Sequence, residues 1–424
     1  MKGFCTLFLL LTIHSLFGQV YVEKQSRHRF AQMTLGVDLE ANFGGKSQFI
    51  NDTGTLSQAD LSTSLRPRFL IGGTHFWGHA DIYIAIPLFA TTLETENQEI
   101  LAFRGVETVF KYYPWRIKHN QLRPFLGVSF APFYYEQRNN NFDFPSGPEL
   151  NRTAFPLLTG LTFNTRQHLF ELGVAWNYAN SQDYFISRNQ VENVDLPPLL
   201  GTISYKYMFD TTLGAEKGWE SGQTKKVTER RAAAKKLNGF YLGAGMSSAF
   251  WLSESSYNES ERPYIEKYNT SIMPDFTLGY YLHQPDINLA IGYRGYGSST
   301  SAYGAVQRLN RKSFVLEGTK YLFDYQGFAP FVGPALSYEN LSFVESFEGE
   351  RTFDVQEAKV SYGLTFGWDI RPDRIQNFIL RTNLRWYPNL FLDLEPGSRV
   401  SFNNLEFNFI QLIIYPNRMF RKKG

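Results

Sequence analysis

Apolar and polar side chains alternate along long stretches of this chain. In residues 33–43 the odd positions, from Met33 to Phe43, are apolar, and the even positions, from Thr34 to Asn42, are polar or small. Residues 360–369 alternate in the same way. This period of two predicts β-strands, because successive side chains of a strand point to opposite faces. The stretches run for about ten to fourteen residues, which exceeds the usual soluble strand and fits a tilted strand across a bilayer.

We expect eight such strands in each half of the chain. In the first half they cover residues 33–43, 65–77, 81–92, 101–114, 122–137, 153–165, 168–180 and 198–210. In the second half they cover residues 239–252, 272–283, 286–297, 312–323, 328–343, 357–370, 376–388 and 403–416.

The connections between these strands alternate in length. Long polar connections cover residues 44–64, 93–100, 138–152, 181–197, 253–271, 298–311, 344–356 and 389–402, and the intervening connections are short. Short turns on one side and long loops on the other are typical of outer-membrane barrels. The sequence therefore predicts an all-β, transmembrane antiparallel barrel fold in a cell outer membrane.

The two halves also repeat short motifs in the same order. Leu35-Gly36 corresponds to Leu242-Gly243, and Lys111-Tyr112-Tyr113 corresponds to Lys320-Tyr321-Leu322. Further along, Pro124-Phe125-Leu126-Gly127 corresponds to Pro330-Phe331-Val332-Gly333, and Gly160-Leu161-Thr162-Phe163 corresponds to Gly363-Leu364-Thr365-Phe366. We interpret this correspondence as an internal duplication of a unit of roughly 190 residues.

The Lys-Tyr-Tyr run at 111–113, followed by a short turn and Pro-Phe-Leu-Gly at 124–127, resembles the OmpA/OmpX/opacity-type family of eight-stranded outer-membrane barrels. The aromatic-rich composition is similar to that of Bacteroidota-type members. The aromatic-terminated strands at 205–209 and 415–420 resemble the signals that the barrel-assembly machinery recognises. The family includes adhesins, envelope-integrity proteins, lipid enzymes and secretion accessories, so the resemblance implies a fold more than a function. The doubled unit departs from the family pattern.

The domain organisation follows from these patterns. Residues 1–18 read as a signal peptide that contains Cys5, the only cysteine, and residues 19–32 as an N-terminal periplasmic segment. Two eight-strand units at 33–210 and 239–424 flank a basic periplasmic linker at 211–238, which we expect to be helical from Thr224 to Leu237. The near-neutral net charge of +2 argues against nucleic acid as a partner.

Sixteen strands can close as two narrow barrels or as one wide barrel. The long charged linker favours tandem eight-stranded barrels, because neighbouring strands of a single barrel need only a short turn. Charges of both signs are expected to point inward: Asp38, Glu40, Glu107, Lys111, Lys320, Asp369, Arg381 and Arg385. In narrow barrels these charges would pair with one another, whereas in one merged sixteen-stranded barrel they would line water.

Aromatic residues gather where strands are expected to end. We expect Tyr112, Tyr113, Trp115, Trp176, Trp386 and Tyr387 to belong to the two interfacial girdles of the membrane. The loops also carry aromatic residues, Phe142, Phe144, Tyr184, Phe185, Tyr257, Tyr264 and Tyr268. These rings can either form a partner surface or pack the loops over the barrel mouth, and we favour packing.

No arrangement of residues predicts catalysis, a cofactor or a metal centre. The histidines His79, His119 and His168 fall in or beside the short turns, away from the outer rim where outer-leaflet lipid would be attacked. Acidic residues of the outer loops, such as Glu94, Glu96 and Glu99, can bind a divalent cation, although solvated loop acids are more common.

We therefore expect a non-enzymatic barrel with a structural, envelope or loop-mediated role. Its expected partners are membrane lipid and lipopolysaccharide, the barrel-assembly machinery, and a protein at the outer loops or the basic linker. A porin-like channel is the main alternative, and a lipid-active enzyme or secretion accessory is a weaker one.

Overall fold

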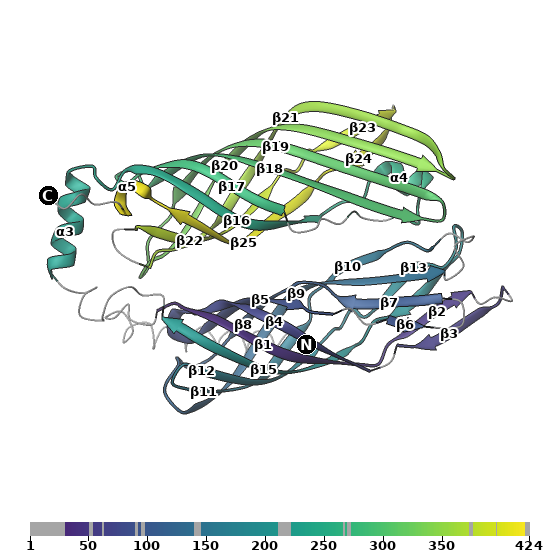
Figure 1. The fold of residues 1–424 in the computed structure, drawn as a ribbon, viewed down its shortest axis with the longest axis horizontal. Helices are drawn as coiled ribbons and strands as arrows, with labels where there is room; N and C mark the ends of the chain where they lie inside the picture. The colour runs from purple at the N-terminus through teal and green to yellow at the C-terminus, as the bar shows by residue number, and fades with distance from the viewer. Residues whose placement is uncertain are drawn as a thin grey trace, which may run out of the picture.

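The computed structural model describes residues 30–419, except 51–53, 62, 90–91, 95–97, 140–145, 211–221, 266–267, 269–272, 373–375 and 396. The expected leader and most of the segment 19–32 lie outside this part. Two barrels, connected through one helix, make up nearly all of it (Figure 1). Within the described ranges, no helix is long and apolar enough to cross a membrane.

The first barrel is a ring in the order β9-β11-β12-β15-β1-β4-β5-β8, which the pairing of β11 with β9 closes. Its strands are β1 (Gln32–Phe43), β4 (Ser64–His75), β5 (Ala80–Pro87), β8 (Glu107–Tyr112), β9 (Gln121–Asn139), β11 (Leu157–Thr165), β12 (His168–Trp176) and β15 (Leu199–Asp210). The last strand, β15, pairs with β1 along the whole of β1.

The outer end of the first barrel carries further strands in segments that we expected to be loops or barrel strands. β7 (Gln98–Arg104) and β10 (Leu150–Ala154) extend the wall by pairing with the outer half of β9, and β6 (Thr92–Glu94) pairs with β7. A separate sheet contains β2 (Lys46–Ile50), β3 (Leu56–Asp60), β13 (Ser181–Phe185) and β14 (Val191–Asp195). The short helix η1 (Phe76–Gly78) lies in the turn between β4 and β5.

The second barrel closes in the order β16-β17-β18-β19-β20-β21-β22-β25. Its strands are β16 (Gly239–Trp251), β17 (Met273–Leu282), β18 (Ile287–Ala302), β19 (Ala305–Tyr321), β20 (Phe328–Phe347), β21 (Glu350–Ile370), β22 (Phe378–Trp386) and β25 (Asn404–Ile414). The expected long loop at 298–311 is wrong, because β18 and β19 continue through it to a tight turn at Tyr303-Gly304. Both turn residues have positive φ.

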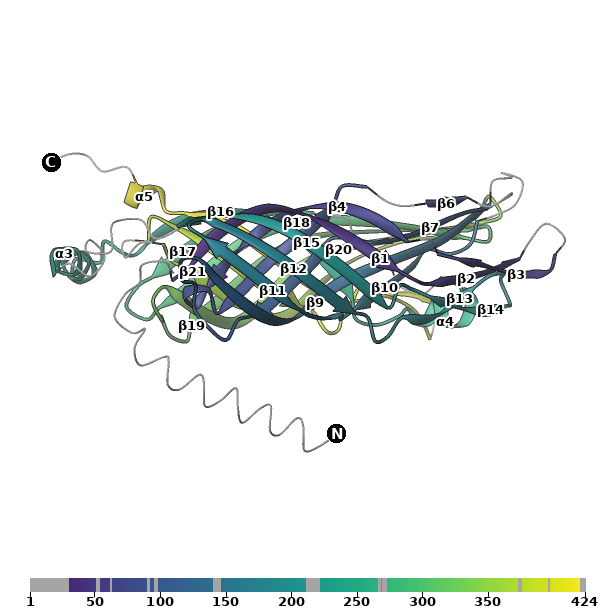
Figure 2. The ribbon, with the colours of Figure 1, turned by 90° about the horizontal axis from the view of Figure 1, so that it is seen from below.

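The remaining elements lie at the barrel ends. The linker helix α3 (Gly222–Ala233) and the terminal helix α5 (Pro416–Met419) lie at the end of the short turns, and α4 (Ser256–Glu261), β23 (Phe391–Glu395) and β24 (Ser398–Ser401) lie at the opposite, outer end (Figures 1 and 2). The helix in the linker was predicted, although it begins and ends slightly earlier than expected.

Strand pairing decides between one barrel and two. The first strand of the second unit, β16, pairs with β17 and β25, and β15 pairs with β1 and β12. The tandem prediction is therefore confirmed, and the merged sixteen-stranded barrel is wrong.

The faces of the strands are the reverse of those of a soluble sheet protein. Apolar side chains point outward and remain exposed, for example Leu172 at 60% and Ile203 at 65%. Charged and polar side chains on the alternate positions are buried inside each ring. An apolar exterior around a polar interior is the arrangement of a barrel in a bilayer.

Candidate functional site: the barrel interiors and the outer loops

Arginine side chains bridge three carboxylates in the outer half of the first barrel. Arg68 Nη1 lies 2.6 Å from a carboxylate oxygen of Glu40 and 2.6 Å from one of Glu107, and its Nε donates to Asp38 at 2.8 Å. Arg104 also donates to Glu40, at 2.6 Å, and to Glu107. All five side chains are buried, so the carboxylates are neutralised by partners from neighbouring strands rather than by water.

A second ionic layer lies below, toward the short turns. Lys206 Nζ donates to Asp81 at 2.6 Å and lies 3.1 Å from Glu171. Lys111 Nζ donates to Glu171 at 2.8 Å, and the Tyr113 hydroxyl donates to the same carboxylate at 2.7 Å. The two layers fill the first barrel with paired charges over much of its height.

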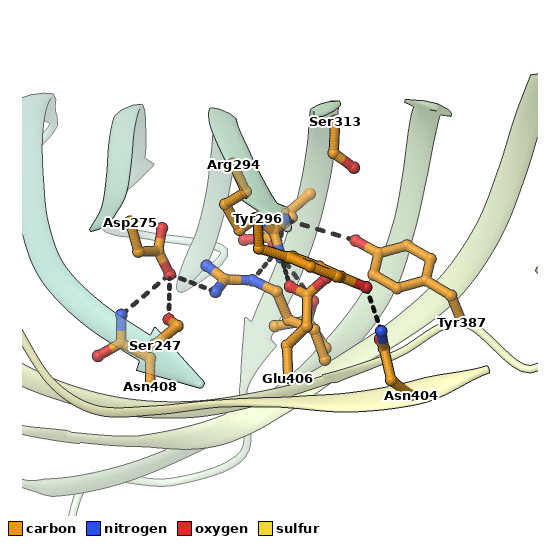
Figure 3. A network of polar contacts seen from close by, with 12 residues as sticks. Ser247, Asp275, Arg294, Tyr296, Ser313, Tyr387, Asn404, Glu406 and Asn408 are labelled. Atoms are coloured by element: carbon orange, nitrogen blue, oxygen red, sulfur yellow. Dashed lines mark hydrogen bonds and ion pairs between the residues drawn. The ribbon is translucent and has the colours of Figure 1, made fainter. Parts of the chain in front are cut away.

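The second barrel has a corresponding network around Glu406 (Figure 3). Arg311 donates to Glu406 at 2.7 Å and, through two nitrogens, to Glu339 at 2.7 Å each, and Arg294 donates to the other oxygen of Glu406. Arg385 bridges two further carboxylates, Glu317 and Asp275, at 2.5 Å each. Asn408, Ser247 and Gln411 also donate to Asp275.

Nearer the short turns, Asp369 is held by Arg381 and Tyr321. Arg381 donates to both carboxylate oxygens, at 2.8 and 3.0 Å, and the Tyr321 hydroxyl donates to one of them. Arg381 also donates to the Tyr321 oxygen at 2.8 Å.

The structure places seven of the eight predicted interior charges inside the barrels, and Lys320 outside. Lys320 is exposed, and its Nζ donates to the carbonyl of Pro285. The prediction for Lys320 is therefore wrong. In β19 the inward positions are odd, so Tyr321 points inward and Lys320 shares the outward face with Phe314 and Leu316.

Two of the six predicted interfacial aromatics also point inward. Tyr113 contacts Glu171, and the Tyr387 hydroxyl accepts a bond from Arg294 at 3.4 Å. Each was predicted to be interfacial together with its neighbour in sequence, Tyr112 or Trp386. Adjacent residues of a strand point to opposite faces, so only one residue of each pair can face the membrane. The others lie outward as expected: Trp115, Trp176 and Trp386 are exposed, and Tyr112 is half-buried.

Sequence reasoning missed most of the interior partners. They are Arg66, Arg68, Asp81, Arg104, Glu171, Lys206, Asp275, Arg294, Arg311, Glu317, Glu339 and Glu406. A usable signal was present, since each lies on the face opposite the outward apolar residues of its own strand. Following that alternation along every predicted strand would have identified them as inward-pointing, but not their partners.

Outer loops cover the mouth of the second barrel. Glu345, fully buried, accepts bonds from Tyr257 at 2.7 Å, Gln307 at 2.7 Å, Thr352 at 2.9 Å and Arg262 at 3.1 Å. Burial, together with the neighbouring carboxylate of Glu345, raises the pKa of the Tyr257 phenol, which stays neutral as a donor.

An apolar cluster lies around this polar bond set. It contains Trp251, Tyr257, Tyr268, Phe343, Leu390, Leu392, Val400 and Phe402 from strands, α4 and the β23–β24 hairpin. Of the loop aromatics singled out in the sequence, Tyr184, Tyr257, Tyr264 and Tyr268 are buried and Phe185 is half-buried, whereas Phe142 and Phe144 lie outside the described residues. The rings that are described therefore pack the loops, as favoured.

The outer end of the first barrel holds the tip of a hairpin from the second. In the β18–β19 turn, the Tyr303 N–H donates to the Ser146 carbonyl at 3.0 Å and the Tyr303 hydroxyl to the Phe185 carbonyl at 2.8 Å. Arg188 donates to the Tyr303 carbonyl at 2.7 Å and forms an ion pair with Glu348 at 2.7 Å.

The barrels also touch at mid-height and at the short-turn end. The rings of Phe130 and Phe250 cross edge to face with centroids 4.5 Å apart. At the base, the buried Phe30 packs against Trp77 of the first barrel at 5.0 Å and Tyr325 of the second at 6.1 Å. Contacts at three heights hold the two barrels side by side.

The turn histidines serve local bonds. His79 Nδ1 lies 2.9 Å from the Tyr113 carbonyl, His168 Nδ1 lies 2.9 Å from the Tyr205 hydroxyl, and His119 accepts the Arg166 N–H. In the described part of the chain no three Asp, Glu, His or Cys side chains are grouped to hold a metal ion, and Glu96 lies outside that part.

Comparison with known proteins gives fold-level likeness at low similarity. No family model and no curated protein matches the chain. Among solved structures, Neisserial surface protein A is 15% identical, with 42% of this chain and 97% of that chain covered and a TM-score of 0.30. The attachment invasion locus protein Ail of Yersinia pestis is 12% identical, with 42% and 96% covered and a TM-score of 0.25. An outer membrane channel of Pseudomonas putida F1 is 8% identical, with 90% and 95% covered and a TM-score of 0.21.

Similarities this low carry no argument about function. The chain's own geometry decides its class: two closed antiparallel rings with apolar exteriors leave no unpaired edge facing lipid, which is the condition for a strand protein to span a bilayer. The chain is an integral outer-membrane β-barrel protein.

Proposed function

We propose that this chain is a non-enzymatic, non-conducting outer-membrane protein whose two plugged barrels hold rigid outer loops for an envelope or interaction role. The single observation that carries the proposal is the filling of both interiors by paired charges. A pore needs charges that face water, whereas here Arg68, Lys206, Arg311 and Arg381 each bond to buried carboxylates.

The covered mouth of the second barrel supports the same conclusion. The cluster around Tyr257 and Phe402 and the bonds to Glu345 lie across its outer opening. The loops are thereby tied to the barrel wall, which suits a preorganised surface better than a gate. Lipopolysaccharide and envelope proteins are the proposed neighbours of that surface.

Ion conductance of the refolded chain, from residue 19 onward, in a planar bilayer tests the proposal. We expect folded, inserted protein to show no stable open-channel steps. A variant that combines Arg311→Ala, Glu339→Ala and Glu406→Ala removes the central network of the second barrel, and we expect it to leak. Arg308→Ala, an outward residue on the same strand, is the matched control.

Large, stable steps from the wild-type chain would contradict the proposal and favour the porin-like alternative. Turnover of lipid in the same membranes by the wild-type chain would contradict its non-enzymatic part. Folding of each sample is checked by its resistance to unfolding in detergent without heating.

A further inference from the structure

The short-turn end of the molecule carries an excess of exposed positive charge. Four exposed basic residues lie in and after the linker helix, Lys226, Arg230, Lys235 and Lys236. Four more lie at the ends of the barrel strands, Arg116, Lys118, Arg166 and Lys320. Among the side chains that the structure describes at this end, the exposed acids are Glu229 and Asp324, and Arg371 pairs with Asp324 at 2.9 Å.

These basic groups are not neutralised by the protein. In the described ranges none of the eight takes part in an ion pair, in contrast to the cations of the barrel interior. At the outer end, the exposed basic residues Arg188, Arg351 and Arg399 pair with Glu348, Asp354 and Asp393, whereas Arg308 and Lys312 are exposed without an ion pair among the described residues. The outer end also carries exposed acids, such as Glu259, Glu261 and Glu350, so the excess of exposed basic over exposed acidic residues is found at the short-turn end.

The linker helix is fixed close to the membrane boundary by its C-terminal cap. Lys235 has φ 54°, and the Lys236 N–H bonds back to the Arg231 carbonyl at 2.8 Å, which ends the helix in a Schellman-type turn. The next residue, Leu237, is buried, and its carbonyl accepts a bond from Arg418. The Asn238 side chain then accepts the His283 N–H at 2.8 Å.

Only a few residues separate this cap from lipid. β16 begins at Gly239, and Phe240, its second residue, is outward-facing and exposed, with its ring 4.8 Å from that of Tyr280. The four residue steps from Lys236 to Phe240 span roughly 14 Å at most. Lys236 therefore lies within about two Debye lengths of the interfacial aromatics, close enough for headgroup charge to act on it.

The direction of α3 fits a surface rather than a partner below it. In Figure 1 the helix runs across the long direction of the barrels, and in Figure 2, turned by a quarter, it is seen nearly end-on. An axis perpendicular to the barrels is an axis parallel to the membrane plane. Lys226, Arg230, Lys235 and Lys236 are thus distributed along the membrane rather than away from it.

We propose that α3 and the basic turns bind anionic phospholipid headgroups of the periplasmic leaflet. Clusters of basic residues beside a membrane are attracted to anionic lipids within a Debye length of the surface. The interaction goes beyond the proposed function and does not depend on whether the barrels conduct. It would fix the linker against the membrane and hold both barrel bases at one depth.

A single-cysteine probe tests the proposal, because Cys5 is the only cysteine and the chain from residue 19 has none. Ala233→Cys, at an exposed position of α3, carries a fluorophore, and the protein is placed in lipid nanodiscs with a headgroup-attached quencher. The discs contain phosphatidylcholine alone or phosphatidylcholine mixed with phosphatidylglycerol. We expect the quenched-to-free ratio to rise about five-fold with phosphatidylglycerol, as for one basic residue near an anionic surface, and to fall with added salt.

Charge removal supplies the matched comparison. A variant that combines Lys226→Gln, Arg230→Gln, Lys235→Gln and Lys236→Gln is expected to abolish the phosphatidylglycerol effect. A control variant that combines Arg308→Gln, Lys312→Gln, Arg351→Gln and Arg399→Gln at the outer end is expected to preserve it. Equal quenching of the wild-type probe in both discs, or an effect that survives removal of the four linker charges, overturns the proposal. Charge-dependent sedimentation with isolated peptidoglycan, without any lipid effect, also overturns it and identifies a cell-wall polymer as the partner.

Discussion

At the residue scale, buried charges are neutralised by carboxylates that each bond to more than one cation. Glu406 receives Arg294 on one oxygen and Arg311 on the other, and Glu40 is shared by Arg68 and Arg104. An isolated ion inside such a wall would be costly, and multidentate pairing from several strands offsets that cost. Each shared carboxylate therefore cross-links distant parts of a ring.

Glu406→Gln is expected to lower the free energy of unfolding by about 3 kcal/mol, because it leaves two buried guanidinium groups without their common anion. Urea titration of the protein in lipid vesicles, followed by tryptophan fluorescence, measures the change. Glu357→Gln is the control: Glu357 pairs with Lys359 at 2.8 Å but is partly exposed, so we expect a change below about 1 kcal/mol. Equal losses in the two variants would contradict a network held by Glu406.

At the element scale, the two ends of each barrel are closed in different ways. The outer end uses folded loops, with α4 and the β23–β24 hairpin packed over Glu345. The inner end uses tight turns whose side chains point back under the ring. Tyr281 at the end of β17 donates to Asp286 of the β17–β18 turn at 2.6 Å. Arg371, directly after β21, lies over the ring of Tyr321 at 4.3 Å.

The β17–β18 turn gives stability a pH dependence through His283. Burial lowers the pKa of His283 below its usual value near 6.5. The positive charges of Arg418 and Arg371 lower this pKa further, whereas the carboxylate of Asp286 opposes the shift. The folded chain then binds fewer protons than the unfolded chain, so stability falls as the pH falls from about 6.5 through the folded pKa. We expect the urea midpoint to drop less on acidification in His283→Gln than in the wild type. An identical drop in both would show that His283 keeps an ordinary pKa in the turn.

At the scale of the whole molecule, two complete barrels pack as one body. The outward residues Ile82, Ile84 and Ile86 of β5 are half-buried, whereas Leu172 on β12 is 60% exposed. One side of the first barrel is thus covered by protein and the other faces lipid. Figure 1 shows β22, β25 and β16 of the second barrel on the covered side.

A cross-link tests this packing in the membrane. Phe130→Cys with Phe250→Cys, at rings 4.5 Å apart, is expected to be joined by a short bismaleimide in native-like vesicles. A protease site inserted in residues 211–221 then separates the halves unless they are cross-linked, and a denaturing gel reads the result. Leu172→Cys with Phe250→Cys places one thiol on the lipid-facing side and is expected not to react. Joining of the control pair alone, or of neither pair, would contradict the observed face-to-face arrangement.

The sequence by itself determined the strands and their order. Period two identified the barrel strands to within a few residues at most ends, and the alternation of short and long connections identified which end of the molecule is which. These features are local: the side-chain alternation of one strand and the length of one connection do not depend on the rest of the fold. Because alternation is local, its strict application to β19 is enough to place Tyr321 on the inward face and Lys320 on the outward face.

The tertiary structure alone decided closure and partnership. Whether β15 pairs with β1 or with β16 is a choice between edges far apart in sequence, and each choice satisfies the same local pattern. The sharing of Glu406 by Arg294 and Arg311 likewise depends on how the ring closes. The contact of Tyr303 with Arg188 depends on how the two barrels pack. Alternation determines that a side chain points inward, and only the closed ring brings the opposite charge to it.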